Sequence, residues 1–208
     1  MGIPQFVLAL VFNLVPALSA WLFGWSSFDL ILLYWTENVV IGAVNFVKVV
    51  IVGATQKQYG LTAALAPFFL FHYSVFLLIH AVIIWTVFGQ RSADFVLTDV
   101  PGLLWMAIRT DPFLFWNAVS LAAFQVANFL LYWVAASGWR GVDVQAQTFA
   151  PYGRVAVVHL TILLAAVPVT VIGEPLIAVV CLALLKTALE VGLTWRKAPL
   201  PSPSERLT

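Results

Sequence analysis

The chain has 208 residues, of which 62% are hydrophobic and only 9% are charged, and its mean hydropathy is +1.00. Soluble domains carry about 25% charged residues, so the composition predicts an integral membrane protein that has the lipid bilayer as its main partner. A net charge of +1 excludes the electrostatic attraction on which nucleic-acid binding depends. The single cysteine, Cys181, excludes a disulfide framework and a thiolate metal site.

Six stretches are long enough to cross a bilayer, which takes about 20 apolar residues in a helix. They lie near residues 4–23, 28–52, 66–88, 115–136, 154–172 and 175–195. No basic residue precedes the first stretch, so it is expected to be a retained span rather than a cleaved signal peptide. The predicted fold class is therefore all-α, a polytopic transmembrane helix bundle in one domain that covers residues 1–195.

The charges in the connecting segments predict the orientation of this bundle. One side of the membrane receives most of the basic residues: Lys57, Arg140, Arg154, Arg196, Lys197 and Arg206. The other side receives Arg91 and Arg109, so the positive-inside rule places both termini in the cytoplasm, with the chain in the inner (plasma) membrane. Residues 101–110 are too few to span and predict an interfacial helix. The tail 196–208 is rich in proline and serine and predicts a disordered segment.

The second span carries polar side chains that its surroundings must accommodate. Glu37 and Lys48 fall within about 20° of each other on a helical wheel with ~100° per residue, and Asn38 and Asn45 lie on a neighbouring stripe. An ionisable side chain at the centre of a membrane helix costs about 2.5–3.5 kcal/mol. We therefore expect this side of the helix to face protein or water.

Histidines and further charged residues occur in the other spans. The third span has His72, Tyr73 and His80; the fifth has Arg154 and His159; the sixth has Lys186 and Glu190. A single zinc site with all three histidines is disfavoured. His72 and His80 lie ~12 Å apart along a regular helix, whereas a zinc–nitrogen bond is about 2.1 Å long, and no residue between the two predicts a break.

Depth along the predicted helices sorts these residues into two layers. His72, His159 and Glu190 fall in the inner layer, and Glu37 and His80 fall in the outer one. A carboxylate with a histidine is the chemistry of a proton relay or of a metal site with few ligands. Glu37 and His80 are the candidate catalytic residues, and His72 and His159 are the candidate ligands of a divalent metal. A haem between His72 and His159 is disfavoured because the sequence has no attachment motif.

Each of these residues also has a structural interpretation. Lys186 and Glu190 are four apart and fit an ion pair on one helix face. Asn38 and Asn45 fit hydrogen bonds between helices, and Lys48 fits a side chain that extends to the cytoplasmic interface. Among the candidates, the deep carboxylate of the second span is the hardest to explain by structure alone.

Four segments together resemble a bacterial family of small six-helix integral membrane proteins of unknown function. They are YWTEN from Tyr34, FHYS followed by a histidine, PYGR followed by a histidine, and LKTALE. The resemblance points to the following positions: Glu37, Asn38, His72, Tyr73, His80, Arg154, His159, Lys186 and Glu190. Ser74 stands where the family has glycine, and Glu190 stands where it has aspartate. The resemblance implies no activity and no cofactor.

Three classes of function remain open at this level. The first is a metal-binding or intramembrane catalytic site, and the second is a channel or transporter for protons, ions or a small solute. The third is a structural or assembly subunit, either in a homo-oligomer or with a partner in a membrane complex. The first is narrowly favoured, because the chain has no internal repeat of the kind that many transporters show. Whether the protein is an enzyme is not decided by its sequence.

Overall fold

The structure, a computed structural model, describes residues 22, 26–89, 99–153, 155–156, 159–160, 162 and 164. Regular structure in these residues is all helical and contains no strand. Three of the helices are long and apolar enough to cross a membrane: Ser27–Thr55, Tyr59–Phe88 and Pro112–Val134. For these residues, the prediction of an all-helical chain with helices that can cross a membrane is confirmed. The predicted spans 4–23 and 175–195 and the tail 196–208 lie almost entirely outside the described residues, and 154–172 is described at a few positions only.

The central helix, α2, covers Ser27–Thr55. It begins with a capping box, in which the Ser26 side chain accepts a hydrogen bond from the Asp29 amide and the Asp29 carboxylate accepts one from the Ser26 amide at 3.0 Å. Such reciprocal bonds satisfy amide groups that the first turn leaves unpaired. The helix ends at a tight turn where Lys57 has a φ of 57°, and α3 begins two residues later.

The third helix, α3, covers Tyr59–Ile83 and continues as a π-helical turn, η1, at Ile84–Phe88. Its helical segment between His72 and His80 is unbroken, as the sequence predicts. The short helix α4 covers Val100–Thr110, which agrees with the helix expected at residues 101–110.

The next helix, α5, covers Pro112–Asn128 and continues as the π-helical turn η3 at Phe129–Val134. Asp111 caps it by accepting bonds from the amides of Phe113 and Leu114 at 2.8 and 3.1 Å. The last helix with described bounds, α6, covers Val144–Phe149. Asp143 caps it in the same way. Both caps use the aspartate preference of helix starts.

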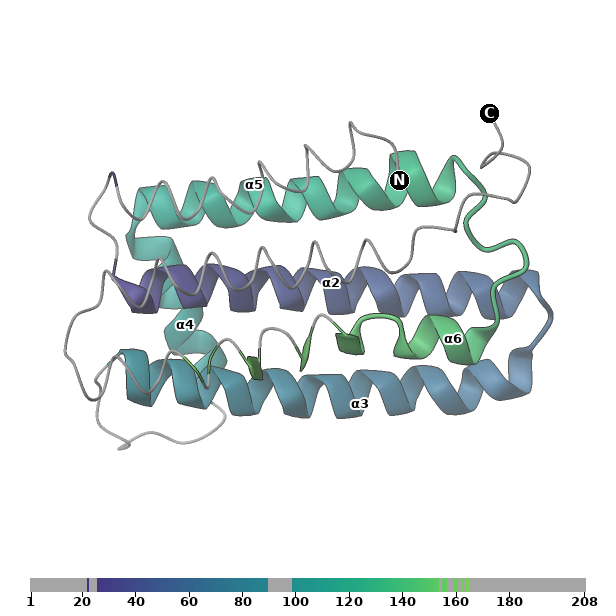
Figure 1. Cartoon of the computed structure of the whole chain (residues 1–208), viewed down its shortest axis with the longest axis horizontal. Coiled ribbons are helices and arrows are strands. Elements are labelled where there is room, and N and C mark those ends of the chain that lie inside the picture. The colour runs from purple at the N-terminus through teal and green to yellow at the C-terminus, as the bar shows by residue number, and fades with distance from the viewer. Residues whose placement is uncertain are drawn as a thin grey trace, which may run out of the picture.

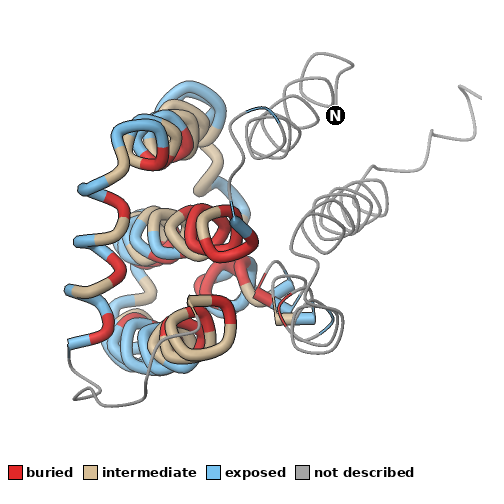
Figure 2. Tube along the Cα trace, turned by 90° about the vertical axis from the view of Figure 1, so that its left-hand side faces the viewer, coloured by how far each residue is buried: buried red, intermediate tan, exposed pale blue. Residues whose placement is uncertain are grey.

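The helices α3, α2 and α5 lie side by side with α2 in the middle (Figure 1). Helix α4 crosses one end of this layer, and α6 lies between α2 and α3 toward the other end. Viewed along the helices, the buried residues lie mainly on the faces that α2 turns to its neighbours, and exposed residues cover much of α3 and α5 (Figure 2). Any group that α2 turns to either side therefore lies inside the bundle.

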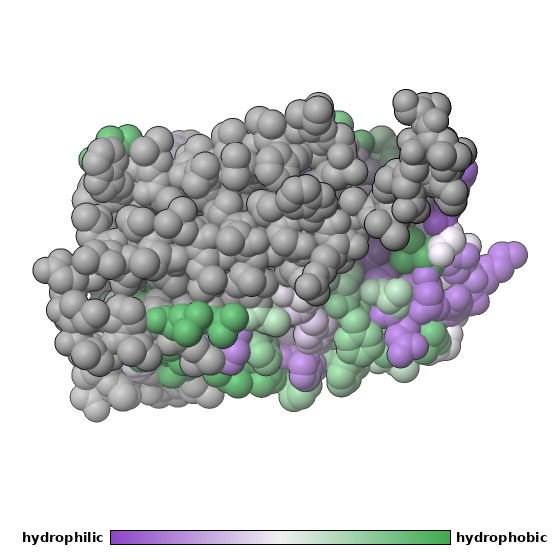
Figure 3. All heavy atoms as spheres, viewed as in Figure 1, coloured by the Kyte–Doolittle hydropathy of each residue, from purple (hydrophilic) through white to green (hydrophobic). Residues whose placement is uncertain are grey.

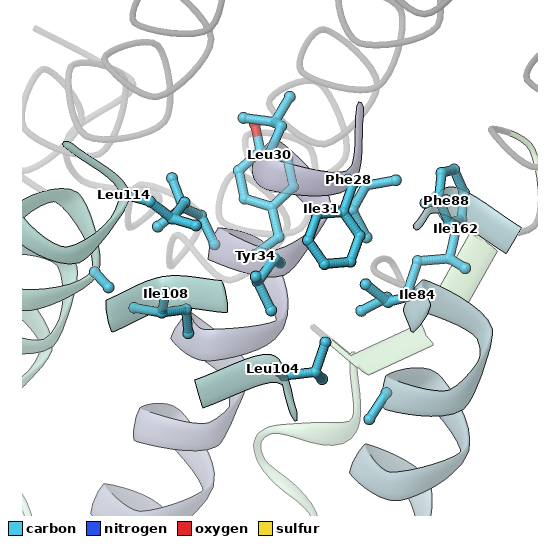
Figure 4. Close-up of a cluster of buried hydrophobic side chains, with 14 of the residues drawn as sticks. Phe28, Leu30, Ile31, Tyr34, Ile84, Phe88, Leu104, Ile108, Leu114 and Ile162 are labelled. Carbon is cyan, nitrogen blue, oxygen red and sulfur yellow. The ribbon is translucent and has the colours of Figure 1, made fainter. Parts of the chain in front are cut away.

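The largest apolar cluster lies at the end of the bundle that α4 crosses (Figure 4). It joins the start of α2 to η1, α4 and the start of α5, with Ile162 from the last described residues. Leu30, Leu32 and Leu104 are fully buried in it. Complete burial of such a side chain contributes about 1.5–3 kcal/mol relative to water, and in lipid the same residues act through close packing.

Glycines let α2 and α3 approach closely. A Cβ at Gly42 would meet the ring of Tyr73, and a Cβ at Gly53 would meet the side chain of Thr62. Small residues at such contacts are typical of membrane helix pairs, because their backbones then come near enough to pack and bond. Hydrophilic residues gather at the end of the bundle where α2 turns into α3 (Figure 3).

Candidate functional site

The histidines of the third and fifth predicted spans meet. His80 Nε2 lies 2.8 Å from His159 Nδ1, and His80 Nδ1 lies 2.9 Å from the carbonyl oxygen of Phe76. His80 is buried, with 4% of its surface exposed. A carbonyl can only accept, so Nδ1 of His80 carries a hydrogen and donates it to Phe76. Both ring nitrogens of His80 are thereby engaged.

The remaining histidine lies in a separate pair. His72 Nδ1 is 2.8 Å from the hydroxyl of Tyr152, and His72 is exposed. The ring of Phe76 stands between the two pairs, with its centroid 6.3 Å from that of His72, 4.9 Å from that of His80 and 5.7 Å from that of His159. The two candidate metal ligands, His72 and His159, thus lie in separate hydrogen-bonded pairs.

The carboxylate of the second span is buried, as expected, with 7% of Glu37 exposed. Its Oε1 accepts a hydrogen bond of 2.9 Å from Gln125 Nε2 on α5. The expected pairing of Glu37 with His80 is not formed through the ring nitrogens of His80, which bond Phe76 and His159. Glu37 and His80 lie toward opposite sides of α2, since Glu37 reaches α5 and His80 belongs to α3.

A small cavity lies between α2 and α3 next to the histidine pair. Its volume is about 10 Å³. It is lined by Trp35, Asn38, Tyr73, Phe76, Leu77, His80 and Val155. Asn38 Nδ2 donates to the carbonyl of Tyr34 at 2.7 Å, and the Tyr73 hydroxyl donates to the Asn38 carbonyl at 2.9 Å. The side-chain oxygen of Asn38 is buried and has no hydrogen-bond partner among the residues that the structure describes.

Two further polar residues of α2 form contacts nearer to its C-terminal end. Asn45 Oδ1 accepts a bond of 2.7 Å from Gln147 Nε2 on α6. The Lys48 ammonium lies 5.8 and 5.4 Å from the ring centroids of Phe129 and Trp133, within the range of a cation–π interaction. Glu37 and Lys48 both face the α5 side, as their common helix face predicts, whereas Asn38 and Asn45 face α3 and α6, so the polar residues of α2 do not form a single side.

The depth of His159 differs from the sequence-based estimate, and α6 explains why. Residues 137–151 are expected to form a loop outside the membrane, but α6 packs against α2 and α3 at the level of Asn45. Asn45 lies ten residues before Thr55, the end of α2, or ~15 Å along the helix. The chain thus enters the bundle before Pro151, and His159 reaches the level of His80. Arg154, Lys186 and Glu190 lie outside the described residues.

Several contacting residues are not among the sequence-based candidates. Gln147 and Tyr152 fall in or next to the expected loop, and Phe76 and Trp35 are apolar or aromatic residues of the kind that every span contains. Trp35 links α2 to α3 by a hydrogen bond, in which its indole nitrogen donates to the carbonyl of Leu77 at 2.9 Å. The sequence contains an indication for Gln147, because Asp143, four residues earlier, fits the N-cap of a helix.

The described residues contain no group of three or more His, Cys, Asp or Glu side chains that could hold a metal ion. A profile of known families matches residues 2–206 to one described as a family of unknown function, DUF6498. The chain belongs to DUF6498. No curated protein and no solved structure matches it. The family therefore assigns no reaction to this chain.

Proposed function

We propose that this DUF6498 protein is a multi-pass protein of the inner (plasma) membrane, with both termini in the cytoplasm, that binds and transfers protons through the pair His80–His159. The proposed activity is movement of protons, alone or coupled to an ion or small solute. The observation that carries the proposal is the hydrogen bond of 2.8 Å between the two rings. Each partner comes from a different segment of the bundle, and His80 is buried.

The hydrogen-bond directions define what the pair can do. His80 donates through Nδ1 to Phe76 O, so in the neutral pair its Nε2 accepts the hydrogen of His159 Nδ1. His159 Nε2 then carries a lone pair, and a proton that binds there releases the Nδ1 hydrogen to His80 Nε2. One added proton thus moves positive charge from the His159 ring to the His80 ring without a change in the positions of the rings. Histidine is the side chain whose charge changes most readily near neutral pH.

The same geometry disfavours a metal ion between the rings. Two imidazole nitrogens that bind one tetrahedral zinc ion at about 2.05 Å must be about 3.3 Å apart. His80 Nε2 and His159 Nδ1 are 2.8 Å apart, a distance that fits a shared hydrogen. The pair would have to open before it could bind a metal, and opening would break its hydrogen bond.

A second ionisable group supports the proposal from the other side of α2. Glu37 is buried and accepts the Gln125 amide, so a proton on this carboxyl group would change its charge inside the bundle. Ionisable side chains inside membrane spans, carboxylates and histidines among them, mark ion pathways and proton relays. Glu37 and the histidine pair are separated by the width of α2, which provides two proton-binding groups in one bundle.

The proposal is tested by ¹⁵N NMR of the histidine rings in the purified protein. We expect His80 and His159 to take up one proton together, with linked chemical-shift changes. A proton-flux assay in liposomes then compares His80→Gln and His159→Gln with His72→Gln, the matched control on the same helix. Loss of flux in the first two and retention in the control supports the proposal. Two independent titrations, or flux that neither variant changes, contradict it.

A further inference from the structure

The cavity between α2 and α3 has room for one small molecule. Its volume of about 10 Å³ is close to the ~10–15 Å³ that a single water molecule needs. Aromatic and aliphatic side chains form most of the wall, and three polar residues interrupt it: Asn38, Tyr73 and His80. A cavity with only apolar walls stays dry, whereas polar partners allow a water to bind.

The side-chain amide of Asn38 has a defined orientation, because its Nδ2 donates to the Tyr34 carbonyl. The group left without a partner in the described part of the chain is therefore the acceptor, Oδ1, and it is buried. Asn38 as a whole is 4% exposed. A buried polar atom without a hydrogen bond costs about 1–3 kcal/mol, so a donor in the cavity would stabilise this part of the bundle.

The other polar groups around the cavity also select a donor. The Tyr73 hydroxyl gives its hydrogen to the Asn38 carbonyl, so toward the cavity its oxygen can only accept. The Trp35 indole nitrogen donates to Leu77 O, and both nitrogens of His80 are engaged. The residues around the cavity thus include acceptors and no described donor that is available to a bound molecule.

We propose that this cavity binds one water molecule, which donates a hydrogen bond to Asn38 Oδ1 beside the His80 ring. A water whose hydrogens point to Asn38 and Tyr73 turns its lone pairs toward the remaining wall, which includes His80. It therefore stabilises positive charge on the histidine pair. This role rests on the proposed function, whereas the water site itself does not.

The test is solid-state NMR of the full chain in lipid bilayers, with magnetisation transferred from water to side chains. We expect transfer to the Asn38 amide, the Tyr73 hydroxyl and the His80 ring in the wild-type protein. Asn38→Leu is expected to lose the transfer to His80, and Asn38→Asp, which keeps an oxygen acceptor, is expected to retain it. Asn45→Leu is the matched control, because Asn45 is equally buried on α2 and lies outside the cavity; it is expected to retain the transfer.

Three outcomes overturn the proposal: no transfer to Asn38 and Tyr73 in the wild-type protein, unchanged transfer to His80 in Asn38→Leu, or equal loss in Asn45→Leu. The wild-type measurement decides the question if Asn38→Leu does not fold. The proposed function fails by a different result, namely histidine rings that take up no proton together. A water site without proton uptake and proton uptake without a water site are therefore distinguishable.

Discussion

His80 and His159 are 79 positions apart in the sequence, and their ring nitrogens lie 2.8 Å apart. The contact forms because the chain after α6 runs along α3 in the same direction. Val155 packs with Phe69 and Tyr73, and Ile162 lies in the apolar cluster that contains Ile84 and Phe88. His159 therefore meets α3 between these two contacts, at His80.

Replacement of both histidines tests whether they act as a unit. His80→Gln and His159→Gln should each reduce the free energy of unfolding, and the double variant should lose less than the sum. Hydrogen bonds between membrane helices contribute about 0.6 kcal/mol on average and at most about 1.7 kcal/mol, so we expect a coupling energy in that range. Denaturant unfolding in mixed micelles measures it. The effects of His72→Gln and His159→Gln on the free energy of unfolding should be additive. A coupling energy between these two changes would contradict the pairing of His159 with His80.

Glu37→Gln should leave the fold intact and abolish any proton-dependent activity. The variant keeps an oxygen that can accept the Gln125 amide, but it can neither gain nor lose a proton. Unfolding midpoint and proton flux are measured on the same preparation. Gln125→Leu is the complementary control, since it removes the hydrogen bond and retains the carboxyl group. Normal flux in Glu37→Gln would remove this residue from the site.

Gly42→Ala should destabilise the contact between α2 and α3, because the added Cβ would meet the Tyr73 ring. Added volume in a packed interior costs about 1–3 kcal/mol. Gly60→Ala is the control, since a Cβ at Gly60 would meet nothing within 4 Å. Its effect should be neutral or stabilising. Thermal unfolding followed by tryptophan fluorescence measures both variants, and equal behaviour would mean that the close approach at Gly42 does not occur.

Gln147→Leu tests whether α6 packs inside the bundle. The change removes the donor to Asn45 Oδ1 and leaves a buried acceptor unpaired, which costs about 1–3 kcal/mol. Gln145→Leu lies on the exposed side of the same helix and should have little effect. Cysteine labelling from the aqueous phase provides a second measurement: a cysteine at position 145 should react faster than one at position 147. The reverse order would place α6 outside the bundle.

The helical class and the inward direction of Glu37 follow from the sequence, because apolar length and the cost of a charge in lipid are local properties. The residues that each candidate side chain contacts do not follow from the sequence. Glu37 meets Gln125 and not His80, since helix neighbours depend on how the spans are arranged around α2. His159 lies deeper than its position in the predicted span indicates, because six residues of α6 form a helix within the bundle. A short amphipathic segment gives too weak a signal to distinguish it from a loop.

The shared hydrogen of His80 and His159 is the central claim, and one measurement tests it directly. ¹⁵N NMR of histidine-labelled protein in bilayers should show a scalar coupling across the hydrogen bond between His80 Nε2 and His159 Nδ1. On acidification, the signals of the two rings should shift together as one proton is added. Absence of the coupling, together with independent titration of His80 and His159, would contradict the account.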